Sequence, residues 1–221
     1  MNANDIRLIV TLIPIETWNT IYMVLTSTLA ATIMGLPLGI VLVVTDKGGI
    51  KQNAAVNMCV GAIVNVGRSF PFIILMIAII PFTRLLVGTS LGTNAAIVPL
   101  SIAAAPFVAR VVETSLKEIS HGVIEAAQAC GCSTWQIIYK VLLPEAMPSM
   151  VLGATLTIIN LISYSAMAGA MGGGGLGKVA IQYGYNRYET PLMIATVVVL
   201  IILVQIVQLI GNNIARVINK K

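Results

Sequence analysis

Long uncharged stretches alternate with short charged ones along this chain. A bilayer crossing needs about 20 apolar residues, and a charged side chain at its centre costs about 2.5–3.5 kcal/mol. Residues 52–83 form one run that is interrupted only by Arg68, and its two halves are too short to span separately. Four further runs are uncharged and long enough for one crossing each: residues 17–45, 85–109, 146–177 and 190–215. The pattern therefore predicts five membrane-spanning helices.

The composition agrees with this pattern. Of 221 residues, 57% are hydrophobic and 10% are charged, whereas a soluble domain is about 45–50% apolar and about 25% charged. We therefore predict an all-α membrane protein that contacts membrane lipid. One transmembrane domain is expected over residues 1–221, with a helical core at about 17–215 and a cytoplasmic loop at about 110–145.

The distribution of positive charge predicts the orientation in the membrane. Cytoplasmic segments of membrane proteins carry an excess of Lys and Arg. With five helices and a cytoplasmic C-terminus, eight basic residues outside the membrane-spanning helices face the cytoplasm and four face outward, so the N-terminus is expected outside. The net charge of +5 does not indicate a nucleic-acid partner, because the basic residues are scattered and form no stripe with aromatic ones.

The chain offers little for metal binding or catalysis. His121 lies near Cys130 and Cys132 in the sequence, but a structural zinc site normally has four ligands. Packing explains these residues better. Paired carboxylates and a Ser, His and Asp constellation are not found either. We expect no metal site, no bound cofactor and no catalytic residue in this chain.

The polar stretch at about residues 110–145 is predicted to contain two short helices that lie across the cytoplasmic membrane face. Ser133 and Gln136 have the spacing of a capping box, which opens a helix, and Pro144 is expected to end that helix. Upstream, small and apolar residues recur at helical spacing. Gly131 is expected to separate the two helices.

Seven residues of this loop form a motif. They resemble the signature loop of binding-protein-dependent ABC permeases, in which EAAxxxG is followed after nine residues by an aliphatic residue, any residue, Leu and Pro. The resemblance implies that the loop inserts into a groove on a separate ATP-hydrolysing subunit and transmits its closure; small residues there allow close approach. An amphipathic helix resting on lipid headgroups is the alternative. The seven residues are Glu125, Ala126, Ala127, Gly131, Val141, Leu143 and Pro144.

Other segments resemble the permeases of methionine importers in particular. The resemblance implies a bacterial inner-membrane complex with a second copy of the permease, two ABC ATPase subunits that hold ATP and Mg, and an external methionine-binding protein. Import of another amino acid or a small peptide is the alternative within this class. The segments are residues 68–72 (RSFPF), 80–84 (IPFTR), 87–90 (VGTS), 95–100 (AAIVPL), 104–107 (AAPF), 140–146 (KVLLPEA), 164–167 (YSAM) and 182–185 (QYGY).

A glycine-rich stretch at residues 172–178 matches GxGxxG and most of the phosphate-binding pattern GxxxxGK[ST]. However, Val179 stands where a nucleotide loop needs a hydroxyl group, and no strand leads into this stretch. We expect no nucleotide here. Instead, we expect a flexible backbone at the outer mouth of the protein, in a re-entrant or close-packed turn that lines a cavity.

Three residues within predicted helices are candidates for functional roles. Arg68 lies near mid-membrane between Gly67 and Pro71, which favour a kink with free carbonyl groups that a guanidinium can bind. We expect a structural clamp, with substrate contact as the alternative. Tyr164 and Met167 precede a run of small residues and are candidates for narrowing the pore, with ordinary packing as the alternative.

An ion-coupled secondary carrier is the competing functional class. Such carriers usually place an acidic residue or a broken helix at mid-membrane. None of the eight acidic residues falls within a predicted membrane-spanning helix, which argues against this class. Five helices are also few to enclose a pathway alone, which favours an oligomer.

Overall fold

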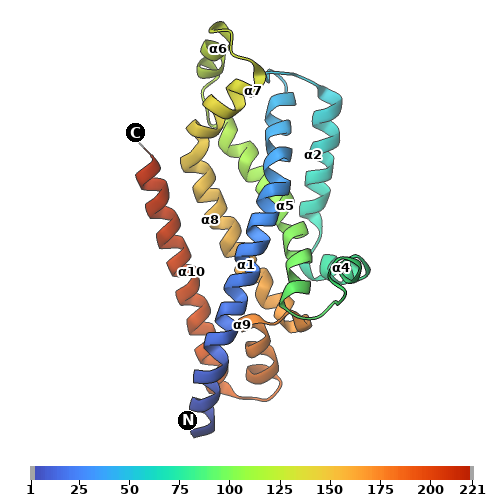
Figure 1. Cartoon of the computed structure of the whole chain (residues 1–221), viewed down its shortest axis with the longest axis vertical. Helices are drawn as coiled ribbons and strands as arrows, with labels where there is room; N and C mark the ends of the chain where they lie inside the picture. The colour runs from blue at the N-terminus through green and yellow to red at the C-terminus, as the bar shows by residue number, and fades with distance from the viewer. Residues whose placement is uncertain (1–2, 220–221) are drawn as a thin grey trace.

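The uncharged runs form long helices, because a helix satisfies its own backbone hydrogen bonds where no water is present. The computed structural model describes residues 3–219. The longest helices run side by side along the long axis of the molecule, and the chain termini lie toward opposite ends of this axis (Figure 1). These helices are α1 (Ala3–Thr45), α5 (Thr93–Lys117), α8 (Leu143–Ala168) and α10 (Thr190–Ile218).

Residues 52–83 do not form the single helix that we predicted. They form α2 (Ala54–Ser69), α3 (Phe72–Ala78) and α4 (Ile80–Val87), with a bend of 101° between α2 and α3. Pro71 at the break has no N–H group to donate, and it favours the extended backbone that Phe70 adopts. In the described part of the chain, four helices are long and apolar enough to cross a membrane, or five if the bent pair is one span.

Helices α1 and α5 pack closely through small residues at the centre of the bundle. A Cβ atom at Gly35 would lie 2.6 Å from the carbonyl oxygen of Ala105, and one at Gly39 would lie 2.6 Å from that of Ala109. The two backbones are therefore so close that only glycine fits, as at many helix interfaces in membranes. Leucines from several helices are fully buried and complete the core: Leu42, Leu100, Leu116, Leu142 and Leu161.

Helix α5 differs from the predicted span at both ends. It begins at Thr93 instead of residue 85, and it continues past Arg110 to Lys117. The charged residues prolong the helix because Glu113 pairs with Arg110 at i, i+3 spacing and with Lys117 at i, i+4 spacing. The polar loop is thus shorter than the predicted residues 110–145.

The two predicted short helices of the loop are present as α6 (His121–Ala129) and α7 (Thr134–Gln136). The prediction that Pro144 ends the second one is wrong. Helix α7 continues through the π-helical turn η1 (Ile137–Leu142) into α8. In this wide turn the N–H group of Leu143 donates to the carbonyl oxygen of Ile138, five residues back, so the helix accommodates the proline ring without breaking.

The glycine-rich stretch forms the close-packed turn that was one of the two predicted alternatives. It contains the π-helical turn η2 (Gly169–Gly173), α9 (Gly175–Lys178) and the π-helical η3 (Val179–Tyr185). Gly173, Gly175 and Gly177 are buried, and α9 contacts both α1 and α8. The missing side chains let this backbone approach other helices closely, so the stretch connects helices instead of forming an open loop.

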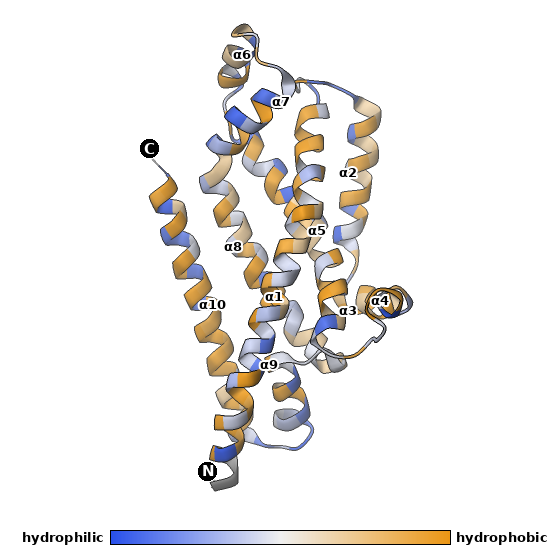
Figure 2. Cartoon of the chain, viewed as in Figure 1, coloured by the Kyte–Doolittle hydropathy of each residue, from blue (hydrophilic) through white to orange (hydrophobic). Residues whose placement is uncertain are grey.

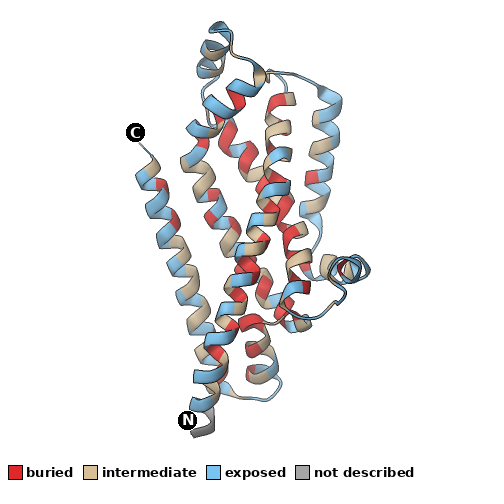
Figure 3. Cartoon of the chain, in the orientation of Figure 1, coloured by how far each residue is buried: buried red, intermediate tan, exposed pale blue. Residues whose placement is uncertain are grey.

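The outer surface of the bundle is apolar. Figure 2 shows hydrophobic residues along the length of α10, and Figure 3 shows that buried positions concentrate on α1, α5 and α8. An apolar surface of this extent is stable in lipid and not in water, so the protein is a multi-pass membrane protein. Exposed apolar side chains of α10 include Val197, Ile201, Ile202, Ile206 and Leu209.

Candidate functional site

Helix α6 carries the first half of the signature motif and is exposed. None of its residues is buried; Glu125 and Ala126 are exposed and Ala127 is half-buried. Gly131 follows with φ of 76°, and a Cβ atom there would meet no atom within 4 Å. The positive φ matches the predicted break between the helices. The segment therefore presents an exposed surface of small side chains at one end of the bundle.

The predicted capping box at the start of α7 is confirmed. The backbone N–H group of Ser133 donates to Oε1 of Gln136 at 2.8 Å, and the N–H group of Gln136 donates to Oγ of Ser133 at 3.4 Å. Two N–H groups that a helix start leaves free are thus satisfied locally. The capping box fixes where the chain turns from Gly131 into the helix.

The second half of the motif lies in the helix that leads into α8. Val141 and Leu143 are half-buried and pack against the hydrophobic core, whereas Pro144 is exposed. Because α7, η1 and α8 are continuous, a force on the loop reaches the interior through a stiff element. The motif thus joins an exposed contact surface to the helix bundle.

Few contacts hold α6 against the rest of the chain. Ile124 and Ala127 pack against the core, and Nε2 of His121 lies 3.2 Å from the carbonyl oxygen of Gly48 in the loop between α1 and α2. Glu125 lies 3.2 Å from Nδ1 of His121. His121 therefore ties α6 to the α1–α2 loop. Within residues 3–219, no three His, Cys, Asp or Glu side chains are grouped to hold a metal ion.

A chain of charged groups that sequence reasoning missed lies beside this loop. Nζ of Lys117 is 2.6 Å from Asp46 and 2.9 Å from Glu113, which also pairs with Arg110 at 2.5 Å. The hydrogen bond from Lys117, with one from the backbone N–H group of Lys47, holds the pKa of Asp46 below its usual value. These pairs join α5 to the α1–α2 loop. The sequence could have indicated only the two local pairs of Glu113, because Arg110 and Lys117 lie three residues before it and four residues after it.

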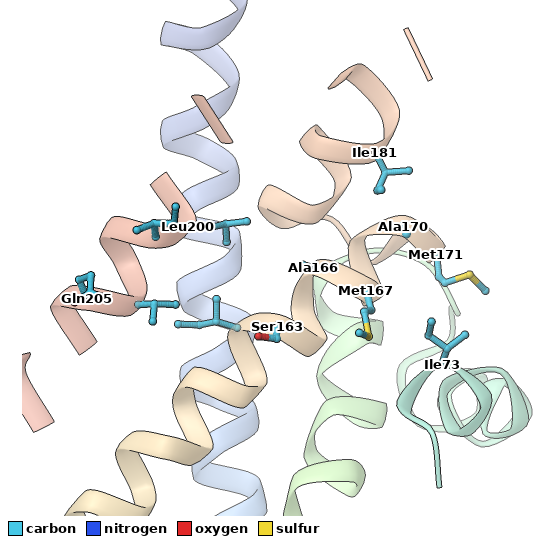
Figure 4. A pocket seen from close by; sticks show the side chains of 12 residues that line it. Ile73, Ser163, Ala166, Met167, Ala170, Met171, Ile181, Leu200 and Gln205 are labelled. Carbon is cyan, nitrogen blue, oxygen red and sulfur yellow. The ribbon is translucent and has the colours of Figure 1, made fainter. Parts of the chain in front are cut away.

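A cavity of about 680 Å³ lies between α3, α8, α10 and the π-helical turns η2 and η3. Its lining is mostly apolar, with Met167 and Met171 on one wall and Ser163 and Gln205 as polar groups. Figure 4 shows Met167, Met171 and Ile73 close together at one part of the cavity. A cavity of this size and polarity is suited to a small, largely apolar molecule.

The structure separates the two predicted pore residues. Met167 lines the cavity and is 42% exposed. Tyr164 does not line it; its ring stacks on that of Phe72, with centroids 4.8 Å apart and planes 1° from parallel. The stacking links α8 to α3 just after the break at Pro71. A gating role for Met167 and Tyr164 stays a prediction.

Arg68 lies in the last turn of α2, directly before the 101° bend. Its side chain is exposed, and it forms no hydrogen bond or ion pair with any residue between positions 3 and 219. The kink that we predicted at this point is present. The clamp is not made with any residue of the described range, so the role of Arg68 stays a prediction.

Comparison with known proteins gives a consistent result. The family model described as binding-protein-dependent transport system inner membrane component matches residues 35–221. The chain is 54% identical over 200 residues to the "Probable D-methionine transport system permease protein MetI" of Vibrio cholerae, covering 90% of this chain and 89% of that protein. It is 48% identical to the "Methionine import system permease protein MetP" of Bacillus subtilis, covering 81% of each.

Solved structures agree with these matches. A chain of the MetNI methionine ABC transporter in an inward-facing conformation superposes with a TM-score of 0.94 at 48% identity, covering 100% of both chains. A chain of an amino acid ABC transporter superposes with a TM-score of 0.74 at 15% identity, covering 95% of this chain and 94% of that one. The second match shows a shared fold.

Proposed function

Because this chain belongs to the family of binding-protein-dependent transport system inner membrane components, we propose that it is the permease subunit of an ATP-driven methionine importer. The family supports transport driven by a separate ATPase. Relatives named as methionine permeases, 48–54% identical over at least 81% of the chain, support methionine as the substrate.

One structural observation carries the proposal. The exposed surface of α6 and Gly131 is connected to the cavity by the continuous helix that α7, η1 and α8 form over residues 134–168. Its last turn includes Met167 of the cavity lining, and the chain leaves the helical conformation at Met171, which also lines the cavity. A stiff helix transmits displacement between a contact surface and a pathway. This is the arrangement that a coupled transporter requires.

The complex that we propose contains two copies of this permease, two ATPase subunits that bind ATP and Mg, and an external methionine-binding protein. The ATPase subunits contact α6 and the exposed motif residues Glu125, Ala126 and Gly131. The N-terminus then lies outside and the C-terminus in the cytoplasm. Two features support this orientation: α6 lies at the end opposite the N-terminus (Figure 1), and the positive-charge bias agrees.

In this mechanism, closure of the ATPase subunits displaces α6 together with the start of the α7–η1–α8 helix. Because packed helices move between discrete arrangements and do not deform continuously, the bundle changes from an inward-open to an outward-open packing. Methionine then passes along the apolar cavity wall. No covalent bond is made or broken by this chain, and ATP is hydrolysed on its partner.

The proposal is tested by co-expressing the permease with its ATPase subunit and purifying the complex through a tag on the ATPase. We expect the two chains to elute together, and uptake of labelled methionine by reconstituted vesicles to be inhibited by excess unlabelled methionine. Competition by a different amino acid or a small peptide, without competition by methionine, would refute the substrate. Failure to co-purify would refute the coupled complex.

A further inference from the structure

The carboxylate of Glu16 is buried in α1 beside a distant part of the chain. Its Oε2 accepts hydrogen bonds from the backbone N–H group of Gly175 at 2.8 Å and from the amide of Asn19 at 2.9 Å. Its Oε1 lies 3.4 Å from Nζ of Lys178. A buried carboxylate is costly unless it is paired and hydrogen-bonded. These contacts therefore fix α1 against the glycine-rich turn that precedes and forms α9.

The backbone of this turn is shaped to receive the side chains of α1. Gly174 and Gly175 have φ of 82° and 74°, which favours glycine. A Cβ atom at Gly175 would lie 2.7 Å from Oγ1 of Thr20. That hydroxyl accepts a hydrogen bond from the N–H group of Leu176 at 2.8 Å. The stretch that resembles a phosphate-binding loop thus binds a carboxylate and a hydroxyl group of its own chain.

The same turn joins two walls of the cavity. Met171 of η2 comes before the turn and Ile181 of η3 comes after it, and both line the cavity. Within the turn, a Cβ atom at Gly177 would lie 2.3 Å from the carbonyl oxygen of Ala166, which is another lining residue. Because the turn packs backbone against backbone with the wall, a shift of the turn moves the wall with it.

We propose that Glu16, with Thr20, is a positioning residue that holds the cavity wall of Met171 and Ile181 in place. The role rests on the proposed function, in which the cavity belongs to the translocation pathway. This positioning role belongs to the N-terminal half of α1, which lies before the residues 35–221 that the family model matches. Glu16 acts through the backbone of the turn and does not itself line the cavity.

The test measures how accessible the cavity wall is in the purified complex of permease and ATPase. Met171 is replaced by Cys in a parent protein whose native cysteines, Cys59, Cys130 and Cys132, are Ser. The rate of labelling by a water-soluble maleimide is then compared between variants. Glu16→Ala is expected to raise this rate at least about tenfold, because losing the hydrogen bond from Gly175 to the charged carboxylate alone corresponds to a shift of this size.

Two comparisons separate positioning from general damage. Glu16→Gln keeps an acceptor for the Gly175 N–H group and is expected to restore a rate close to that of the parent. Thr20→Val is expected to raise the rate, whereas Thr11→Val, whose hydroxyl bonds only to Arg7 of its own helix, is expected to leave it unchanged. If Glu16→Ala does not assemble, the two threonine variants decide the question.

The inference is overturned if Glu16→Ala, or in its place Thr20→Val, is labelled at the parent rate while eluting and unfolding as the parent does. Equal rates for Thr20→Val and Thr11→Val would also overturn it. Labelling requires no transported substrate. A parent complex that shows these rate changes but no methionine uptake would therefore refute the proposed substrate and not the positioning role.

Discussion

Two segments of this protein are rich in small residues and use them in opposite ways. Around α6 the small side chains are exposed, and a Cβ atom at Gly131 would meet nothing within 4 Å. In the turn at α9, a Cβ atom at Gly177 would lie 2.3 Å from the carbonyl oxygen and 2.5 Å from the Cα atom of Ala166. Small residues allow backbones to approach in both places. The partner of the α9 turn is in the same chain, whereas we propose that the partner of α6 is another subunit.

The difference shows why a motif of small residues has to be interpreted together with its exposure. The α6 surface is open, and we propose that its motif contacts another subunit. The turn at residues 172–178 has the spacing of a nucleotide loop, but its backbone N–H groups already bind Glu16 and Thr20. Substitutions in the two segments should therefore fail in different ways, the first in assembly and the second in folding.

The largest effect is expected from Gly177→Val. The new side chain would overlap the backbone of Ala166, which cannot move without displacing α8, so we expect a destabilisation of about 3 kcal/mol, at the upper end of overpacking costs. The yield of monodisperse permease and its thermal unfolding measure this loss. Gly61→Val is the control, because a Cβ atom there would lie 3.8 Å from its nearest neighbour, Leu42. Equal stability of the two variants would contradict the buried role of the turn.

Gly131→Leu should leave the bundle folded and weaken its assembly with the ATPase. Misplacing a docked helix costs about 1–3 kcal/mol if it resembles overpacking, which corresponds to roughly tenfold weaker association or more. We expect normal membrane insertion, weak co-purification and loss of methionine uptake, with any remaining ATP hydrolysis no longer tied to transport.

The control for Gly131→Leu separates backbone strain from docking. Gly88 also has a positive φ, of 80°, with nothing within 4 Å of a Cβ atom, but it ends α4 away from the loop. Gly88→Leu should carry the same local strain and still bind the ATPase. Normal ATPase binding and wild-type transport by Gly131→Leu would show that the segment around Gly131 is not the coupling loop.

Arg68→Ala is expected to have a smaller effect, on the amount of assembled complex more than on substrate preference. Since Arg68 is exposed and unbonded within residues 3–219, its clamp would be made with a neighbouring subunit. Polar contacts between membrane helices average about 0.6 kcal/mol, or about threefold in assembly. Quantifying the complex by size-exclusion chromatography measures this change. An unchanged amount of complex with an altered competition profile would favour substrate contact instead.

The smallest effect is expected from Lys178→Ala, which should leave ATP hydrolysis by the complex nearly intact. The ammonium group pairs with Glu16 at 3.4 Å and belongs to α9, which lies toward the end of the bundle that carries the N-terminus, away from α6 (Figure 1), so it does not contact nucleotide on the ATPase. The Gly175 N–H group still donates to Glu16. ATPase assays of the purified complex provide the measurement. ATP binding by the isolated permease that disappears in this variant would contradict the account of the turn.

Local signals predicted much of the helical structure and the coupling loop. The uncharged runs located the long helices, because a charged side chain in the bilayer core is costly and this rule can be applied to each segment of the sequence separately. The capping box at Ser133 and the positive φ at Gly131 were also predictable, because each depends on residues within one turn. These features need no knowledge of distant contacts.

The errors arose where distant residues decide the local structure. Glu16 was placed outside the first helix, but its donor Gly175 lies 159 residues away, and no local pattern reveals such a pair. Pro144 was expected to end a helix because it has no N–H group to donate. The π-helical turn η1 before it changes the hydrogen-bond pattern, so the helix continues past the proline. A kink near Pro71 was predicted, but the bend of 101° that separates α2 from α3 was not. Helix α3 packs on α5 and α8, and the run of apolar residues does not show these contacts.

We propose that this chain carries methionine across the membrane with energy supplied by ATP hydrolysis on a partner subunit. The most direct measurement is uptake of labelled methionine, presented with its binding protein outside, into vesicles that hold the complex and ATP inside, after all ion gradients are collapsed. The account predicts uptake that requires ATP and is abolished when ADP replaces it. Uptake that proceeds without ATP and follows an imposed ion gradient would contradict it.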